Sequence, residues 1–222
     1  RDFTAASVKW LPRLMKYVYL DKNVVYSIRG PRQVGKTTLL KLLVKNLLEK
    51  NNAINVMYFT CDLVKDNIAL NDLLVTYYAW VRAQNQDRVF IFLDEISSVK
   101  EWQKSIKFFI DTNGNNNLTM VLTGSHALDI KASIEQLPGR LGEKEHVSTH
   151  KLMLPMKFAE YVETRKPELY AQVKQLGLGT APKRTQEFLE LINGKLPASA
   201  SNLMRLLPEF NSLLDEYLIT GG

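Results

Sequence analysis

The chain has 222 residues, of which 45% are hydrophobic, so it is long enough to bury one full core and to begin a second lobe. Its formal net charge is +6, but 29 basic residues stand against 23 acidic ones and are spread along the chain, so charge alone does not indicate nucleic acid. The single cysteine, Cys61, excludes an internal disulfide, and no apolar run has the length of a membrane span or the pattern of a signal peptide, so we expect a cytoplasmic protein.

Short apolar runs alternate with helical patterns over the first two thirds of the chain. After an amphipathic stretch at 10–20, the expected strands are 24–28, 54–60, 89–93, 119–122 and a polar strand within 145–152. The expected helices are 36–50, 71–84, 101–112 and 127–136. This alternation predicts an α/β fold, with a parallel sheet sandwiched by helices.

Between the first strand and the first helix, residues 30–37 read Gly-Pro-Arg-Gln-Val-Gly-Lys-Thr, the full G-x-x-x-x-G-K-[ST] spacing of a phosphate-binding loop. The two glycines allow left-handed backbone angles that turn N–H groups inward around a phosphate. The lysine suits the β and γ phosphates, and the first threonine suits Mg²⁺. The expected nucleotide-binding residues are Gly30, Pro31, Arg32, Gln33, Val34, Gly35, Lys36, Thr37 and Thr38.

The apolar run 88–93 ends in two adjacent acids, Asp94 and Glu95. Continuous apolarity is typical of a strand buried on both faces of a parallel sheet, and the nucleotide crevice opens at the carboxyl ends of such strands. We expect Asp94, together with Thr37, to hold Mg²⁺, Asp94 acting through the metal's water shell. Glu95 is expected to orient and deprotonate the attacking water. The alternative is a solvated pair of acids at the start of the following helix.

The next β-branched run, 118–122, ends in Thr123-Gly124-Ser125. A hydroxyl at the tip of the strand beside the acidic one is placed to contact the γ-phosphate or the attacking water, and Ser125 is the preferred candidate, ahead of Thr123. A serine in this position is equally at home as a turn or N-cap residue.

Together these segments resemble the prokaryotic and archaeal AAA+-like P-loop ATPases of the AAA_14 type, which usually carry a DUF4143 C-terminal domain and are related to the archaeal STAND-type ATPases. The resemblance covers about 14–160 and is carried by 30–37, Leu93-Asp94-Glu95-Ile96, Trp102, Leu122-Thr123-Gly124-Ser125, Leu137-Pro138-Gly139-Arg140 and 154–160. The segment Pro155-Met156-Lys157-Phe158 departs mildly from the family pattern. Residues 217–222 look like the beginning of the C-terminal domain, so we expect more chain to follow.

The resemblance implies a nucleotide-hydrolysing switch and makes Arg140 the expected arginine at the γ-phosphate, in its own subunit or a neighbour's. The alternative is that Arg140 is simply an exposed residue after an ordinary Pro-Gly turn. One strand is expected between the loop strand and the acidic strand, and the base-reading motif Asn-Lys-x-Asp is absent, so the additional-strand (ASCE/AAA+) class of ATPases is favoured over GTPases.

The expected domains are an N-terminal helical segment at 1–20, a P-loop ATPase core at 21–155 and a helical region at 156–222. Helices are expected at 157–165, 185–192 and 198–218, with a loop at 174–184. This region is either a lid beside the nucleotide and the start of a truncated C-terminal domain, or a linker without contact to ATP.

The sequence therefore predicts a Mg²⁺-dependent ATPase switch whose catalytic residues are Lys36, Glu95, Ser125 and Arg140, with ATP and Mg²⁺ as cofactors. Expected partners are ATP and ADP, with no membrane, while DNA or a protein bound through the C-terminal part, and oligomerisation, stay open. Two rival interpretations are an ATP-gated DNA- or protein-binding module with little or no turnover, and a P-loop kinase.

Overall fold

The computed structural model describes residues 10–84, 88–114, 116–125, 148–175 and 181–220. This part of the chain forms two compact units. One spans Leu11–Leu154, and the other joins Trp10 to the residues from Pro155 onward. In neither unit does a described helix have both the length and the apolarity needed to cross a membrane.

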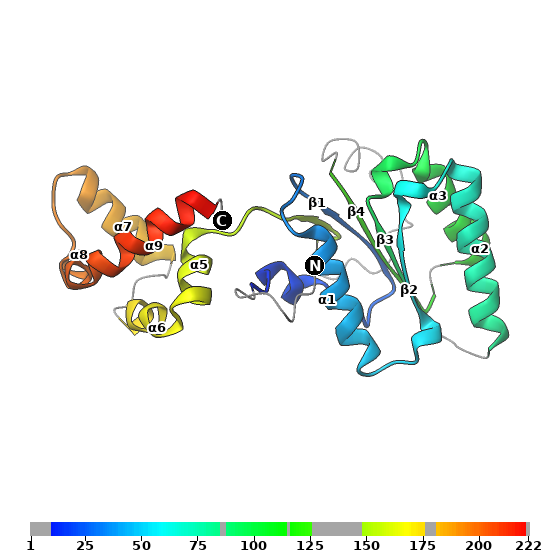
Figure 1. The fold of residues 1–222 in the computed structure, drawn as a ribbon, viewed down its shortest axis with the longest axis horizontal. Coiled ribbons are helices and arrows are strands. Elements are labelled where there is room, and N and C mark those ends of the chain that lie inside the picture. Colours follow the sequence, from blue (N-terminus) through cyan, green and yellow to red (C-terminus); the bar gives the residue numbers. More distant parts are fainter. Residues whose placement is uncertain (1–9, 85–87, 115, 126–147, 176–180, 221–222) are drawn as a thin grey trace. The chain divides into compact units, whose positions relative to one another are not determined.

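A parallel sheet is the centre of the first unit (Figure 1). Its strands are β1 (Val24–Arg29), β2 (Val56–Thr60), β3 (Val89–Asp94), β4 (Leu118–Gly124) and β5 (His150–Leu152). They lie in the order β2-β3-β4-β1-β5, and every neighbouring pair is parallel. Strands β3 and β4 are buried along their whole length. In the sheet β4 lies between β1 and β3, which confirms the predicted additional-strand class, whereas β2, the strand between them along the chain, lies at the edge of the sheet.

Helices cover both faces of this sheet, as predicted. Figure 1 shows α1 (Lys36–Leu48) on one face and α2 (Asn67–Ala83) and α3 (Trp102–Asn113) on the other. The core beneath α2 and α3 combines helix residues such as Leu70, Leu74, Ile106 and Phe109 with strand residues such as Ile91, Leu93, Met120 and Leu122. Short 3-10 helices complete the described part of the unit: η1 (Arg13–Tyr17), η2 (Ala53–Asn55), η3 (Cys61–Leu63) and η4 (Ile96–Ser98).

The second unit is helical. Its elements are α5 (Phe158–Arg165), α6 (Pro167–Gln175), α7 (Ala181–Ile192), α8 (Ala198–Leu203), η5 (Met204–Leu206) and α9 (Leu207–Thr220). Its core packs Met156, Tyr161, Val162, Leu169 and Leu213 together.

Prolines explain where the second unit differs from expectation. The single helix expected at 198–218 is divided at η5, because Pro208 lacks an N–H and its ring would clash with the carbonyl four residues earlier. Helix α6 was not expected, and α7 begins inside the expected loop 174–184. In both helices a proline stands in the first turn, where its missing N–H removes no hydrogen bond, so these prolines begin helices.

Helix α2 begins at Asn67, earlier than the expected Asn71. The carboxylate of Asp66 accepts a hydrogen bond of 2.9 Å from the backbone N–H of Ala69, so Asp66 is the N-cap. This bond satisfies one of the four N–H groups that a helix start leaves without an internal partner.

We predict that Asp66→Ala lowers the free energy of unfolding by about 1 kcal/mol, because the cap bond is lost. Asp72→Ala is the matched control, since Asp72 lies on the same helix, is exposed and is outside the first turn. Urea unfolding followed by circular dichroism compares the two. Equal stability of both variants would contradict the capping role.

Candidate functional site

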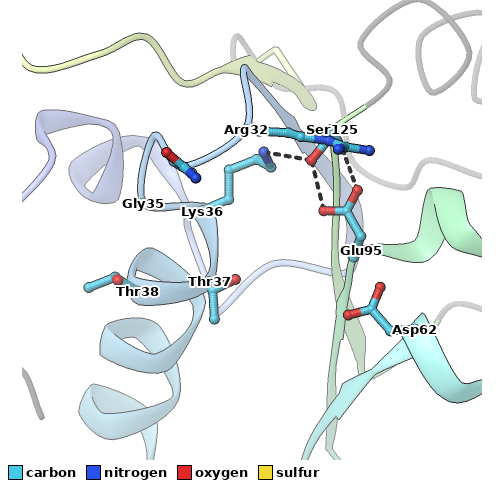
Figure 2. A pocket seen from close by; sticks show the side chains of 9 residues that line it. Arg32, Gly35, Lys36, Thr37, Thr38, Asp62, Glu95 and Ser125 are labelled. Atoms are coloured by element: carbon cyan, nitrogen blue, oxygen red, sulfur yellow. Dashed lines mark hydrogen bonds between the residues drawn. The ribbon is translucent and has the colours of Figure 1, made fainter. Parts of the chain in front are cut away.

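The carboxyl ends of β1, β3 and β4 meet at a pocket of about 500 Å³ (Figure 2). One wall comes from the loop after β1 and the start of α1, with Arg32, Gln33, Gly35, Lys36, Thr37 and Thr38. The opposite wall comes from the ends of β2, β3 and β4, with Asp62, Glu95 and Ser125. The pocket therefore lies where the motif spacing and the strand order predict a nucleotide.

The loop backbone differs in one respect from expectation. Gly35 has the expected left-handed conformation, with φ of 97°, but the other left-handed loop residue is Gln33, with φ of 64°, and not Gly30. Gly30 is required for another reason: a Cβ added there would lie 2.3 Å from the carbonyl oxygen of Met153, just beyond β5. The backbones of Gly30 and Met153 thus approach too closely for a side chain at position 30.

Lys36 is the most buried charged group on the loop wall, with 6% of its surface exposed. Its ammonium donates hydrogen bonds to the carbonyl oxygens of Gly30 (3.0 Å) and Pro31 (2.8 Å) and to the hydroxyl of Ser125 (3.3 Å). Burial lowers the pKa of Lys36, and the negative charges of Glu95 and Asp94 act in the opposite direction. The Lys36 ammonium is therefore bound by acceptors of the chain itself, and a phosphate could replace them.

Glu95 faces Lys36 across the pocket and is held by two serines. Its Oε1 accepts from the backbone N–H of Ser125 (2.9 Å) and the hydroxyl of Ser97 (3.1 Å), and its Oε2 accepts from the hydroxyl of Ser125 (3.0 Å). Glu95 also has a left-handed backbone, with φ of 50°, a conformation that side chains other than glycine adopt rarely. Ser125 therefore links the lysine of the loop to the carboxylate at the end of β3, as the dashed lines in Figure 2 show.

Asp94 lies beneath the pocket, is 4% exposed and is not part of the pocket wall. Its Oδ1 accepts from the hydroxyl of Thr123 (2.6 Å) and its Oδ2 from the hydroxyl of Tyr58 (3.0 Å). Thr123 also accepts from the backbone N–H of Glu95 (3.1 Å). Asp94 thereby connects the ends of β2, β3 and β4.

The structure brings together most of the residues proposed from the sequence. Arg32, Gln33, Gly35, Lys36, Thr37, Thr38, Glu95 and Ser125 line one pocket, whereas Gly30, Pro31, Val34 and Asp94 support it without lining it. Arg140 lies outside the described residues. Sequence reasoning missed Ser97 and Asp62. The signal available for Asp62 was its position directly after a strand, because the ends of parallel strands share one edge of the sheet.

The donor set of the pocket fits Mg²⁺, which prefers oxygen ligands and is usually bound through one or two carboxylates, substrate phosphates and several waters. Thr37 offers a hydroxyl, and Asp62 and Glu95 offer carboxylates on the same pocket surface. In the described part of the chain no group of three or more His, Cys, Asp or Glu residues is arranged to hold a metal by itself. A metal in this pocket would therefore depend on the phosphates for part of its coordination.

The AAA domain family AAA_14 matches residues 22–162, which is most of the chain. The chain belongs to this family. Its members are P-loop proteins of the nucleotide-binding ATPase type, and the predicted resemblance to AAA_14-type, AAA+-like ATPases is confirmed, whereas the DUF4143 domain and the STAND relationship stay predictions. The match includes the phosphate-binding loop, the acidic strand and the strand that ends at Ser125.

The chain is also similar to one curated protein in sequence and to two solved structures. The uncharacterized protein MJ1637 of Methanocaldococcus jannaschii is 32% identical over 150 residues, which cover 66% of this chain and 29% of that protein. The Aeropyrum pernix ORC1 protein, solved in complex with DNA, matches at a TM-score of 0.52 and 13% identity over 73% of this chain and 50% of that one. The Walker-type ATPase PABY2304 of Pyrococcus abyssi matches at 0.45 and 13% identity, covering 95% and 74%. The match to MJ1637 spans under a third of that protein's length.

We predict that Gly30→Ala lowers the free energy of unfolding by about 1–3 kcal/mol, because the added methyl group meets the carbonyl of Met153 and forces a backbone shift. Thermal unfolding of the variant and the wild type measures this loss. Ala53→Gly, at the start of an exposed 3-10 turn, is a control of similar size. An unchanged unfolding midpoint for Gly30→Ala would show that β5 does not pack against the loop.

Proposed function

We propose that the protein binds ATP together with Mg²⁺ and hydrolyses it, and that hydrolysis switches the helical unit and any attached domain between states. The observation that supports this most strongly is the continuous set of hydrogen bonds from Lys36 through Ser125 to Glu95 in one pocket. It connects a phosphate-binding cation, a candidate γ-phosphate sensor and a candidate base across three strands of the sheet.

In this proposal the loop N–H groups and Lys36 bind the β and γ phosphates. The phosphate oxygens replace the carbonyl oxygens of Gly30 and Pro31 as acceptors for the ammonium of Lys36. Thr37 would hold the metal through its hydroxyl, and Asp94 would contribute through the metal's water shell. When bound, Mg²⁺ supplies positive charge that stabilises the transferring phosphoryl group.

Glu95 is the proposed general base, and Ser125 the residue that senses the γ-phosphate. In the structure both carboxylate oxygens of Glu95 accept hydrogen bonds from serines, which occupy lone pairs that a general base needs. A phosphate that draws the Ser125 hydroxyl toward itself would release one of these bonds. Base activation would then depend on the triphosphate being present. Arg140 stays the proposed arginine at the γ-phosphate.

A second candidate function is an ATP-gated module that binds DNA or a protein with little or no turnover. The engagement of Glu95 by Ser97 and Ser125 favours it, because a base whose lone pairs are occupied abstracts a proton slowly. The similar ORC1 protein was solved in complex with DNA, which makes duplex DNA the first partner to test. Phosphate release with and without duplex DNA separates the two functions, and ADP formed without free phosphate would indicate a kinase.

We predict that Lys36→Ala weakens ATP binding by roughly 100-fold or more, since each hydrogen bond to a charged group contributes about 1.5–3 kcal/mol and the lysine is placed to make several. Lys45→Ala is the matched control, because Lys45 lies on the exposed side of the same helix. Isothermal titration with a nonhydrolysable ATP analogue measures both affinities. Equal affinity of the two variants would rule out the loop as the phosphate site.

We predict that Glu95→Gln leaves ATP affinity within a few-fold of the wild type and lowers the rate of phosphate release by roughly 10²–10⁴-fold, because an amide cannot accept the proton of the attacking water. Glu49→Gln, an exposed position after α1, makes the same chemical change outside the pocket. Steady-state phosphate release gives the comparison. Undiminished turnover in Glu95→Gln would assign the base elsewhere.

A further inference from the structure

Asp62 is a pocket residue to which neither the motifs nor the family resemblance assigns a role. It belongs to η3, directly after β2, and lines the same pocket as Thr37 and Glu95. Figure 2 shows its carboxylate on the strand side of the pocket, beside Glu95 and across from Thr37. The side chain is exposed, and its Oδ2 accepts a hydrogen bond of 3.2 Å from the hydroxyl of Thr60. Its Oδ1 accepts none from the described residues.

Asp94 has the opposite surroundings. Each of its oxygens accepts a hydroxyl, from Thr123 and from Tyr58, and the residue is almost fully buried. Asp94 is also absent from the pocket wall, so it is not the carboxylate that meets a ligand there directly. Both acids lie near Tyr58 and Cys61. Burial raises the pKa of the Tyr58 hydroxyl and raises the pKa of the Cys61 thiol to about 12, and the negative charges of Asp94 and Asp62 act in the same direction. Asp62 is thus the acid of this pair that faces the pocket.

The charges on the pocket wall show why a cation is needed there. Arg32 and Lys36 on the loop side are balanced by Asp62 and Glu95 on the strand side. A triphosphate held by the loop would face two carboxylates across a pocket of about 500 Å³, and like charges at such separations repel. A divalent cation between the phosphates and the acids turns this repulsion into attraction. Hydrated Mg²⁺ is the cation that carboxylates and phosphates bind jointly.

We propose that Asp62 is a metal-site residue: its carboxylate accepts hydrogen bonds from the water shell of the nucleotide-bound Mg²⁺, on the side opposite Thr37. This inference rests on the proposed function, since the metal arrives with the nucleotide. Asp94 then acts mainly as an anchor that holds the ends of β2 and β4 to β3, and Asp62 is the carboxylate that responds to the metal.

The test is the Mg²⁺ dependence of nucleotide affinity in Asp62→Asn, measured by titration of the full chain with a nonhydrolysable ATP analogue in Mg²⁺ and in EDTA. In the wild type Mg²⁺ should strengthen binding. In Asp62→Asn this gain should fall by about tenfold or more, as is typical when a residue that orients a metal's ligands is removed. Affinity in EDTA should be equal or higher, because one repelling charge is gone.

Two further variants keep the test decisive. Asp72→Asn removes the same charge from the exposed face of α2 and should behave as the wild type in both conditions. Asp62→Glu keeps a carboxylate and should retain part of the gain from Mg²⁺. Thermal unfolding of every variant shows whether the fold is intact, and partial rescue by Asp62→Glu would support a direct role of the carboxylate.

The outcomes separate this inference from the proposed function. If the wild type binds no nucleotide, the proposed function fails and this inference with it. If the wild type binds with a Mg²⁺ dependence that Asp62→Asn leaves unchanged, only this inference is overturned. Slower phosphate release in Asp62→Asn with unchanged Mg²⁺ dependence would likewise overturn it, because Asp62 would then act on the attacking water.

Discussion

The pocket depends on one buried ammonium group, that of Lys36. A buried charge without partners is strongly unfavourable, and here two carbonyl oxygens of the loop and one serine hydroxyl satisfy it. Two of these hydrogen bonds join Lys36 to the loop after β1, and the third joins it to Ser125 at the end of β4. The hydroxyl of Ser125 in turn donates a hydrogen bond to the carboxylate of Glu95. In the proposed function, a phosphate that replaces these acceptors of the Lys36 ammonium would affect three strand ends at once.

Strained backbone conformations lie on both sides of the pocket. Gln33 and Glu95 both have left-handed backbones, one on each side of the pocket. Such conformations in residues other than glycine cost of order 1–3 kcal/mol each and persist when the surroundings hold them in place. Around Glu95 the hold comes from Thr123 and Ser125 at the end of β4, which bond its backbone and its carboxylate. The parallel pairing of the buried strands β3 and β4 places both ends side by side.

The features that could be predicted from the sequence are those encoded by neighbouring residues. The loop, the buried strands and the order of elements follow from local spacing, and Glu95, Ser125 and Lys36 were found because each lies in a recognisable motif. What was missed depends on contacts distant in sequence. The need for glycine at position 30 arises from Met153, and the place of Asp62 in the pocket arises from the pairing of β2 with β3. No local pattern contains either contact.

Asp62, Asp94 and Glu95 illustrate how position alone separates the roles of similar side chains. All three follow or end adjacent strands at the same edge of the sheet, yet Asp94 is bonded by two hydroxyls, Glu95 is bonded by two serines, and Asp62 is an exposed residue of the pocket wall bonded by Thr60 alone among the described residues. A buried carboxylate bonded by hydroxyls of two neighbouring strands holds those strands together, and one bonded by hydroxyls on the pocket wall can be released by a competing anion. One that is open to solvent is free to meet a cation. The different surroundings of these acids therefore follow from how deeply each is buried and from which hydroxyls the neighbouring strand ends supply.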